Sequence, residues 1–155
     1  MKHSFLSNPY LLLCSRSILG VVFVVAAIDK IVAPDAFAES VYAYGLVPYA
    51  MINLFALIIP WLELVCGVFL VAGVRLRSCA SLVSMLLLFF IIAIIIALVR
   101  NLNIDCGCFG RDHATPISWM KVLEDTGLFL LGVHIIFFDI GLLTIEGIFS
   151  QTDRE

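Results

Sequence analysis

The sequence predicts an all-α integral membrane protein, an antiparallel DoxX-like four-helix bundle in a single domain of residues 1–155. Apolar residues make up 63% of the chain and charged residues only 14%. A soluble domain of this length has too little interior to bury so much apolar surface. Four apolar stretches of about 20 residues also match the length of helix that crosses a bilayer. Helices are expected because backbone groups in lipid must be satisfied within the segment.

The first expected helix covers residues 10–28 and is interrupted only by Arg16. Lys2 followed by this apolar run also fits a cleaved signal peptide. Against that alternative, several residues recur at intervals of three or four and so share one helical face: Arg16, Gly20, Phe23, Ala27 and Lys30. We therefore expect a retained helix whose polar side chains face the interior of the bundle.

The other three expected helices cover residues 51–74, 79–99 and 126–145. Glu63 is the only charge in the second helix, and the third helix has none. Three connections join the helices: a loop at residues 29–50, a tight turn at 75–78 and a loop at 100–125.

The membrane orientation is predicted from the basic residues. Both termini are expected in the cytoplasm, because the short turn carries Arg75 and Arg77 and the cytoplasmic side then holds five basic residues against four. This places the loop of residues 100–125 on the periplasmic side of a bacterial inner membrane. A net charge of −3 gives no support for a nucleic-acid partner.

Cys106 and Cys108 are the strongest candidates for chemistry. A single intervening residue allows the Cα separation that a disulfide requires, and Gly107 permits a tight turn. Strained small rings tend to be oxidising, which suits thiol–disulfide exchange. The residues expected to shape this redox loop are Asp105, Gly107, Phe109 and Gly110.

Two other interpretations of the cysteine pair stay open. A soft-metal site would need further ligands, and only His113 and Asp105 lie nearby in the sequence, so we expect no metal. The two cysteines could also be unrelated loop residues. The remaining cysteines are expected to pack as small apolar side chains within or at the ends of helices: Cys14, Cys66 and Cys79.

Arg16, Lys30 and Glu63 are expected to form a polar network inside the bundle. An ionisable group such as Glu63 is costly at mid-membrane and is usually paired or functional. If the first two helices are neighbours, Arg16 can reach Glu63. Either a structural ion pair or a site for a proton or a quinone headgroup is compatible with the sequence.

These motifs resemble those of the MauE/DoxX group of small four-helix membrane proteins, specifically its methylamine utilisation branch, MauE. The matching elements occur in order: Arg16-xxx-Gly20, Asp29-Lys30, Pro34-xx-Phe37-Ala38, Tyr44-xxx-Pro48, Pro60-Trp61-Leu62-Glu63-Leu64-xx-Gly67, Arg100, Asp105-Cys106-Gly107-Cys108-Phe109-Gly110, and Ser118-Trp119 through Asp125. The Cys-Gly-Cys-Phe-Gly and Pro-Trp-Leu-Glu elements together are the most specific part of the match.

The resemblance implies a redox-associated protein of the inner membrane. For MauE members it implies help in maturing a disulfide-rich periplasmic dehydrogenase subunit, and for DoxX-type members electron transfer from sulfur compounds to quinone. The leading hypothesis is thiol–disulfide exchange with a periplasmic client or a partner thiol oxidoreductase. A non-catalytic subunit that docks a redox partner and a quinone-linked electron-transfer subunit are the alternatives. Quinone is the one cofactor considered, and enzymatic activity is left open.

Overall fold

The computed structural model describes residues 9–102, 104, 106–107 and 116–138, and every element in these residues is a helix. The helices are α1 (Pro9–Val32), α2 (Pro34–Tyr44), α3 (Tyr49–Ala72), α4 (Leu76–Val99) and α5 (Trp119–Phe138). The prediction of an all-α protein is therefore confirmed over the described residues.

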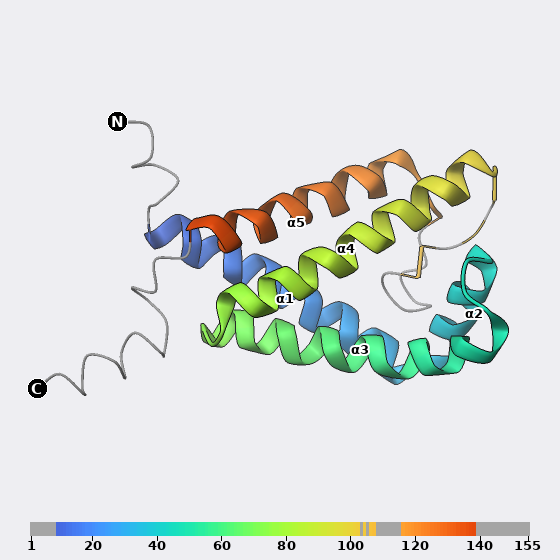
Figure 1. Cartoon of the computed structure of the whole chain (residues 1–155), viewed down its shortest axis with the longest axis horizontal. Helices are drawn as coiled ribbons and strands as arrows, with labels where there is room; N and C mark the ends of the chain where they lie inside the picture. Colours follow the sequence, from blue (N-terminus) through green and yellow to red (C-terminus); the bar gives the residue numbers. More distant parts are fainter. Residues whose placement is uncertain (1–8, 103, 105, 108–115, 139–155) are drawn as a thin grey trace, which may run out of the picture.

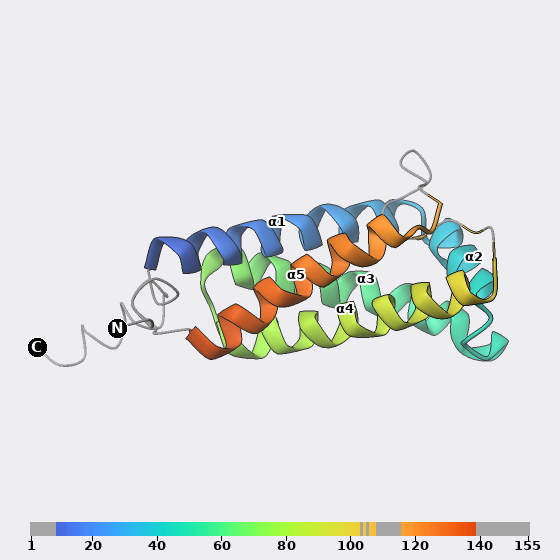
Figure 2. The ribbon, with the colours of Figure 1, turned by 90° about the horizontal axis from the view of Figure 1, so that it is seen from above.

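The four long helices lie side by side, with the shorter α2 at one end (Figure 1). Each long helix contacts two others, because α1 packs on α3 and α5 while α4 packs on the same two. The view from above shows α2 beyond the ends of α1 and α5 (Figure 2). The start of α1 and the end of α5 lie at the opposite end of the molecule from α2.

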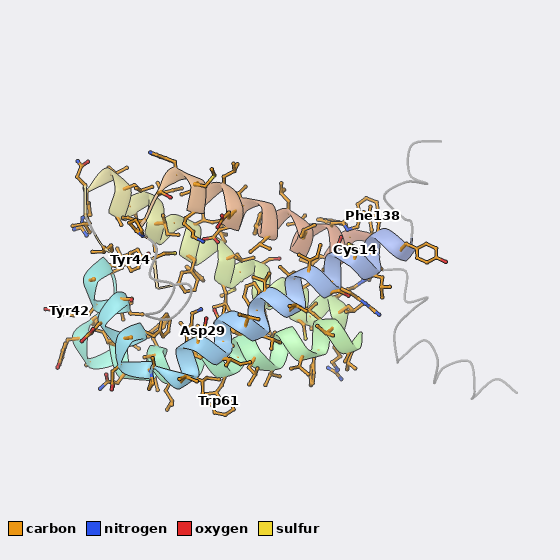
Figure 3. All side chains as sticks on the ribbon, turned by 180° about the vertical axis from the view of Figure 1, so that it is seen from behind. Cys14, Asp29, Tyr42, Tyr44, Trp61 and Phe138 are labelled. Carbon is orange, nitrogen blue, oxygen red and sulfur yellow. The ribbon has the colours of Figure 1, made fainter. Side chains whose placement is uncertain are left out.

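Three helices, α1, α3 and α4, are long and apolar enough to cross a membrane. Large apolar side chains cover their outer surfaces; Leu57, Trp61 and Phe89 are each more than half exposed. Figure 3 shows Trp61 pointing outward from α3. This surface suits contact with lipid and supports the predicted membrane character. The fourth predicted span, residues 126–145, falls partly on α5, and residues 139–145 lie outside the described part of the chain.

The prediction of a loop over residues 29–50 is wrong, because this segment contains α2 and the last turn of α1. Pro34 lies in the first turn of α2, where its missing N–H costs nothing. Gly45 ends the helix in the left-handed region, at φ +63°. Both signals are in the sequence, between longer apolar stretches that dominate the pattern.

Two further boundaries differ from those predicted. The turn between the second and third long helices is shorter, since Gly73 closes α3 at φ +76° and α4 already begins at Leu76. The last helix begins at Trp119, inside the predicted loop of residues 100–125. Its first two turns carry Lys121, Glu124 and Asp125. The predicted helix began only after these charges, because it was placed on the apolar stretch alone.

The backbones of α1 and α3 approach each other closely at Gly20 and Gly67. A Cβ atom added to Gly20 would lie 2.8 Å from the carbonyl oxygen of Gly67, and one added to Gly67 would lie 2.9 Å from the carbonyl oxygen of Gly20. Only residues without a side chain allow the two backbones to meet in this way. The crossing fixes the antiparallel register of the two helices and therefore which polar residues come level.

Two clusters of buried apolar side chains fill the interior. The larger is built from α1, α3, α4 and α5 and contains Leu19, Leu70, Val83 and Ile135. The smaller lies near α2 and is the one that holds the cysteine loop, with these members: Tyr44, Ile94, Ala97, Cys106 and Ile117.

Candidate functional site

Cys106 follows α4 and lies at the end of the molecule occupied by α2. Its exposed fraction is only 1%, and it is disulfide-bonded. The Tyr44 hydroxyl donates a hydrogen bond to the Cys106 carbonyl oxygen at 3.0 Å. Next to it, the N–H of Ile117 donates to the carbonyl oxygen of Ile104 at 3.1 Å and joins the two arms of the connection. The other predicted loop residues, Asp105, Cys108, Phe109 and Gly110, lie outside the described residues.

Gly107 presses the cysteine loop against α2. Its φ of +69° is in the left-handed region, which disfavours residues with a side chain. A Cβ atom added to Gly107 would lie 2.8 Å from the Ser40 Cβ atom and 4.0 Å from the ring of Phe37. Gly107 is therefore required here both for its backbone conformation and for its contact.

One face of α2 provides the surface on which this loop rests. Phe37, Ser40 and Tyr44 are spaced by three and four residues and so lie on the same side of the helix. This role was not predicted, because the segment was expected to be a loop. The helical spacing, together with Pro34 at the start and Gly45 at the end, is the signal that could have revealed it.

Lys30 and Glu63 form a buried ion pair beneath the loop. The Lys30 Nζ atom donates to both carboxylate oxygens of Glu63, at 2.8 and 2.7 Å, and the two side chains are 4% and 2% exposed. The rings of Phe37 and Phe90 lie 5.2 and 5.1 Å from the same Nζ atom. Direct pairing and the two aromatic faces offset the cost of holding these charges away from water.

The expected partner of Glu63 was Arg16, and this is wrong, because the ion pair uses Lys30. The crossing of Gly20 with Gly67 places Arg16 level with the C-terminal end of α3. That position is about ten residues from Glu63, or about 15 Å along the helix. Arg16 is buried, at 8% exposure, but belongs to the opposite end of the molecule. The structure thus brings together Lys30 and Glu63 of the predicted network and leaves Arg16 apart from them.

Asp125 of α5 is a further acidic group of this site and was not predicted as a site residue. It is 8% exposed, and its Oδ2 atom has no hydrogen-bond partner among the described residues. It lies close enough to Lys30 and Tyr44 to interact with both electrostatically. One turn earlier on α5, Val122 packs against the cluster that contains Cys106.

Tyr44 connects the acidic group with the cysteine loop. Burial, and secondly the negative charge of Asp125, raise the pKa of the Tyr44 phenol to about 12. The phenol therefore stays protonated at physiological pH and remains a hydrogen-bond donor to Cys106. In order along the bundle, the site consists of the Cys106 loop, the α2 face, and then the buried Lys30–Glu63 pair with Asp125 beside it.

The three free cysteines lie elsewhere. Cys66 and Cys79 are buried next to each other in the larger apolar cluster, in keeping with the predicted packing role. Cys14 is exposed near the start of α1, at the opposite end from Tyr44, as Figure 3 shows. Within the described ranges no three His, Cys, Asp or Glu side chains gather into a candidate metal site.

Comparison with known families gives one match that covers most of the chain. The family model described as "Methylamine utilisation protein MauE" matches residues 8–138, which include all five helices and the cysteine loop. No solved structure matches the chain.

Three curated proteins, each named methylamine utilization protein MauE, are similar to the chain. The protein of Paracoccus denitrificans is 33% identical over 132 residues, covering 84% of this chain and 71% of the relative. That of Methylorubrum extorquens is 35% identical over 131 residues, covering 84% and 70%. That of Methylophilus methylotrophus is 34% identical over 135 residues, covering 85% and 70%.

Proposed function

Because the chain belongs to the MauE family, we propose that it serves methylamine utilisation as a membrane-bound protein of thiol–disulfide exchange. The observation that carries the proposal is the disulfide-bonded Cys106 in a loop held by specific contacts. Tyr44 and Gly107 fix that loop on α2, above a buried ion pair. Phe37 lies against both this loop and the Lys30 ammonium group and so connects the loop with the ion pair.

The burial of Cys106 determines which sulfur a client would attack. At 1% exposure its side chain is out of reach of another protein, so the attack falls on the expected partner, Cys108. A client thiolate bonds to the Cys108 sulfur, the S–S bond breaks, and its electron pair leaves on Cys106. A second client thiolate then attacks the mixed disulfide and releases Cys108. The client gains a disulfide, and this chain gains two electrons and two protons.

A single pair of variants tests this assignment. Cys106→Ser should accumulate a mixed disulfide with an oxidised partner oxidoreductase, because the Cys108 thiolate attacks the disulfide of that partner and Cys106 is no longer present to resolve the adduct. Cys108→Ser should not, because Cys106 stays buried. Cys14→Ser, which alters an exposed free cysteine outside the loop, is the control and should behave as the unaltered protein. Non-reducing electrophoresis of membranes after acid trapping measures the adducts. Equal adduct levels in both loop variants would contradict the assignment.

The periplasmic orientation is tested by labelling intact cells with a membrane-impermeant maleimide. We expect the loop cysteines to react from outside only after mild reduction with dithiothreitol. Because Cys14 is also exposed, the Cys14→Ser background removes the competing signal. A pair that mild dithiothreitol leaves oxidised would favour a docking subunit without exchange. Labelling that requires permeabilised cells would place the loop in the cytoplasm.

Quinone-linked electron transfer is a second candidate, favoured by the surroundings of Lys30. Its ammonium group lies within 5.2 Å of the ring centroids of Phe37 and Phe90 and is bonded to Glu63, and these residues suit a flat quinone headgroup with carbonyl oxygens. Quinone would supply the acceptor for the electrons that the cysteine pair collects. Loss of quinone-dependent reoxidation in Glu63→Gln, with normal amounts of protein in the membrane, supports this candidate, and unchanged reoxidation removes it.

A further inference from the structure

Asp125 is buried beside an ion pair that already satisfies its own charges. Two N–H groups of Lys30 point to the two oxygens of Glu63, so the cation and the carboxylate neutralise each other. The Asp125 Oδ2 atom is fully buried and receives no hydrogen bond from any described residue. If Asp125 were ionised as well, the site would hold two carboxylates and one ammonium group, and one negative charge would be uncompensated in an apolar interior. The neutral, protonated acid avoids that charge.

The surroundings of Asp125 on each packed element support a protonated acid. Lys30 of α1 is bonded to Glu63 of α3, and Tyr44 of α2 is a neutral phenol. On α5 itself, Lys121 and Glu124 pair with each other at 2.7 Å. The part of α4 that follows Cys79 has no titratable residue. No cation facing Asp125 is therefore left without its own counter-ion in the described part of the site.

Asp125 also lies at the end of the bundle that holds the sulfur that would need a proton. Val122 packs against the smaller apolar cluster, which contains Cys106, and Asp125 follows on the same face of α5, one turn further into the bundle. Tyr44 links the two residues, because its hydroxyl is bonded to the Cys106 carbonyl oxygen and lies close enough to Asp125 to interact with it electrostatically. When Cys106 leaves as a thiolate, the new charge forms in a buried place where an ionised sulfur is costly.

We propose that Asp125 carries a proton in the oxidised protein and donates it to the Cys106 thiolate as the disulfide is reduced. This inference rests on the proposed exchange function. The S–S electron pair stays on Cys106, the proton moves from Asp125 to that sulfur, and the resulting Asp125 carboxylate faces the Lys30 ammonium. On reoxidation, the Cys106 thiol returns the proton to Asp125 as its sulfur attacks the mixed disulfide between Cys108 and the partner oxidoreductase.

The test uses the full-length chain in lipid nanodiscs and dithiothreitol as the reductant. The rate at which Cys106 becomes free is measured from pH 6 to pH 9 by quenching with acid, labelling the denatured chain with maleimide, and mass spectrometry. At pH 6 we expect Asp125→Asn to react about 100-fold more slowly, a typical loss for a missing proton donor. Asp125→Glu should recover most of the rate. Glu124→Gln removes the neighbouring exposed carboxylate and should match the unaltered chain.

The pH profile separates a proton donor from a structural role. The rate advantage of the unaltered chain over the Asp125→Asn variant should shrink as pH rises, because the acid then loses its proton before reduction. Infrared difference spectra of the unaltered chain should show loss of a protonated carboxyl band on reduction, and this change should be missing in Asp125→Asn. If the Asp125→Asn protein does not accumulate, the proposal is tested by the reduction rate of Asp125→Glu and by the infrared spectrum of the unaltered chain.

Three results would contradict the exchange function or the role of Asp125. A chain whose disulfide resists dithiothreitol would refute the exchange function and this inference with it. Rapid reduction with the same rate and pH profile in Asp125→Asn would leave the exchange function intact and overturn the role of Asp125 alone. An infrared spectrum of the unaltered chain without a carboxyl change would also overturn it.

Discussion

The hydroxyl group of Tyr44 donates a hydrogen bond to the carbonyl oxygen of Cys106 across 3.0 Å, although the two residues are 62 positions apart in the sequence. The bond connects the cysteine loop to α2, the short helix between the first two membrane-crossing helices. Because both partners are buried, the Cys106 carbonyl cannot move away from α2 without breaking this hydrogen bond. Access to the disulfide is thus a property of α2 as much as of the loop.

Tyr44→Phe should make the disulfide easier to reduce. The substitution keeps the ring and leaves the buried Cys106 carbonyl without its donor, at a cost of about 1–3 kcal/mol. If reduction requires the loop to open, its rate with dithiothreitol should rise roughly tenfold, since about 1.4 kcal/mol corresponds to a factor of ten. Tyr42→Phe is the matched control, because Tyr42 is on the same helix but points outward, as Figure 3 shows. Equal rates for the two variants would mean that this hydrogen bond does not limit opening.

The contribution of Tyr44 to stability should depend on pH only under alkaline conditions. Its pKa is raised from 10.0 to about 12 in the folded chain, by burial first and then by the Asp125 charge. A raised pKa means that the stabilisation is fully present below pH 10 and is lost as pH rises towards 12. The difference in thermal stability between the unaltered chain and Tyr44→Phe should therefore be constant up to about pH 10 and shrink above it. A difference that already shrinks near pH 8 would contradict the raised pKa.

The sequence was sufficient for the helical class, because apolar stretches of membrane-crossing length have few alternatives in lipid. It also singled out Lys30 and Glu63, which the structure shows to be buried and paired. It was insufficient to predict which basic residue pairs with Glu63. Arg16 and Lys30 share a face of α1, and only the register set by Gly20 and Gly67 brings Lys30 rather than Arg16 to Glu63.

The site residues that were missed lie on segments with mixed composition. Asp125 lies on the charged first turns of α5, and Ser40 and Tyr44 lie on α2, whose apolar face is short. Neither segment has an apolar stretch long enough to cross a membrane, so neither was predicted as a helix over its full length. Their positions follow from tertiary contacts with the cysteine loop, which no local pattern in the sequence records.

Breaking the buried ion pair should be more costly than replacing it. Lys30→Met or Glu63→Gln alone leaves a partner buried without its counterpart, with an expected cost of about 3–5 kcal/mol. The double variant Lys30→Met/Glu63→Gln removes both charges and should be more stable than either single variant. Thermal unfolding in detergent is measured for the unaltered chain, the two single variants and the double variant. The four values give the coupling free energy between the two positions. Additive losses would mean that the 2.7 Å contact contributes little.

Gly107→Ala should release the cysteine loop from α2. The left-handed backbone at φ +69° costs a residue with a Cβ atom about 1–2 kcal/mol, and that atom would also collide with Ser40. Faster reduction by dithiothreitol is expected, as for Tyr44→Phe. Adding Ser40→Gly removes the collision but not the backbone cost. The reduction rate of the double variant should therefore return only part of the way to that of the unaltered chain. Full recovery would show that the backbone conformation contributes nothing.

The crossing of α1 and α3 can be tested independently of the cysteines. Gly67→Val places side-chain atoms where a Cβ atom would already lie 2.9 Å from the Gly20 carbonyl oxygen, so the two helices must move apart. Because the same crossing sets the register of Lys30 and Glu63, we expect Gly67→Val to destabilise the chain and to weaken their coupling in the double-variant test.

Gly127→Ala is the matched control for this test, because a Cβ atom at Gly127 of α5 would have no neighbour within 4 Å. It should leave stability unchanged or raise it by about 0.5–1 kcal/mol, since alanine is the better helix former. Thermal unfolding in the same detergent compares the two variants. If Gly67→Val retained both the stability and the full Lys30–Glu63 coupling, the register of the polar site would have to come from contacts other than the glycine crossing.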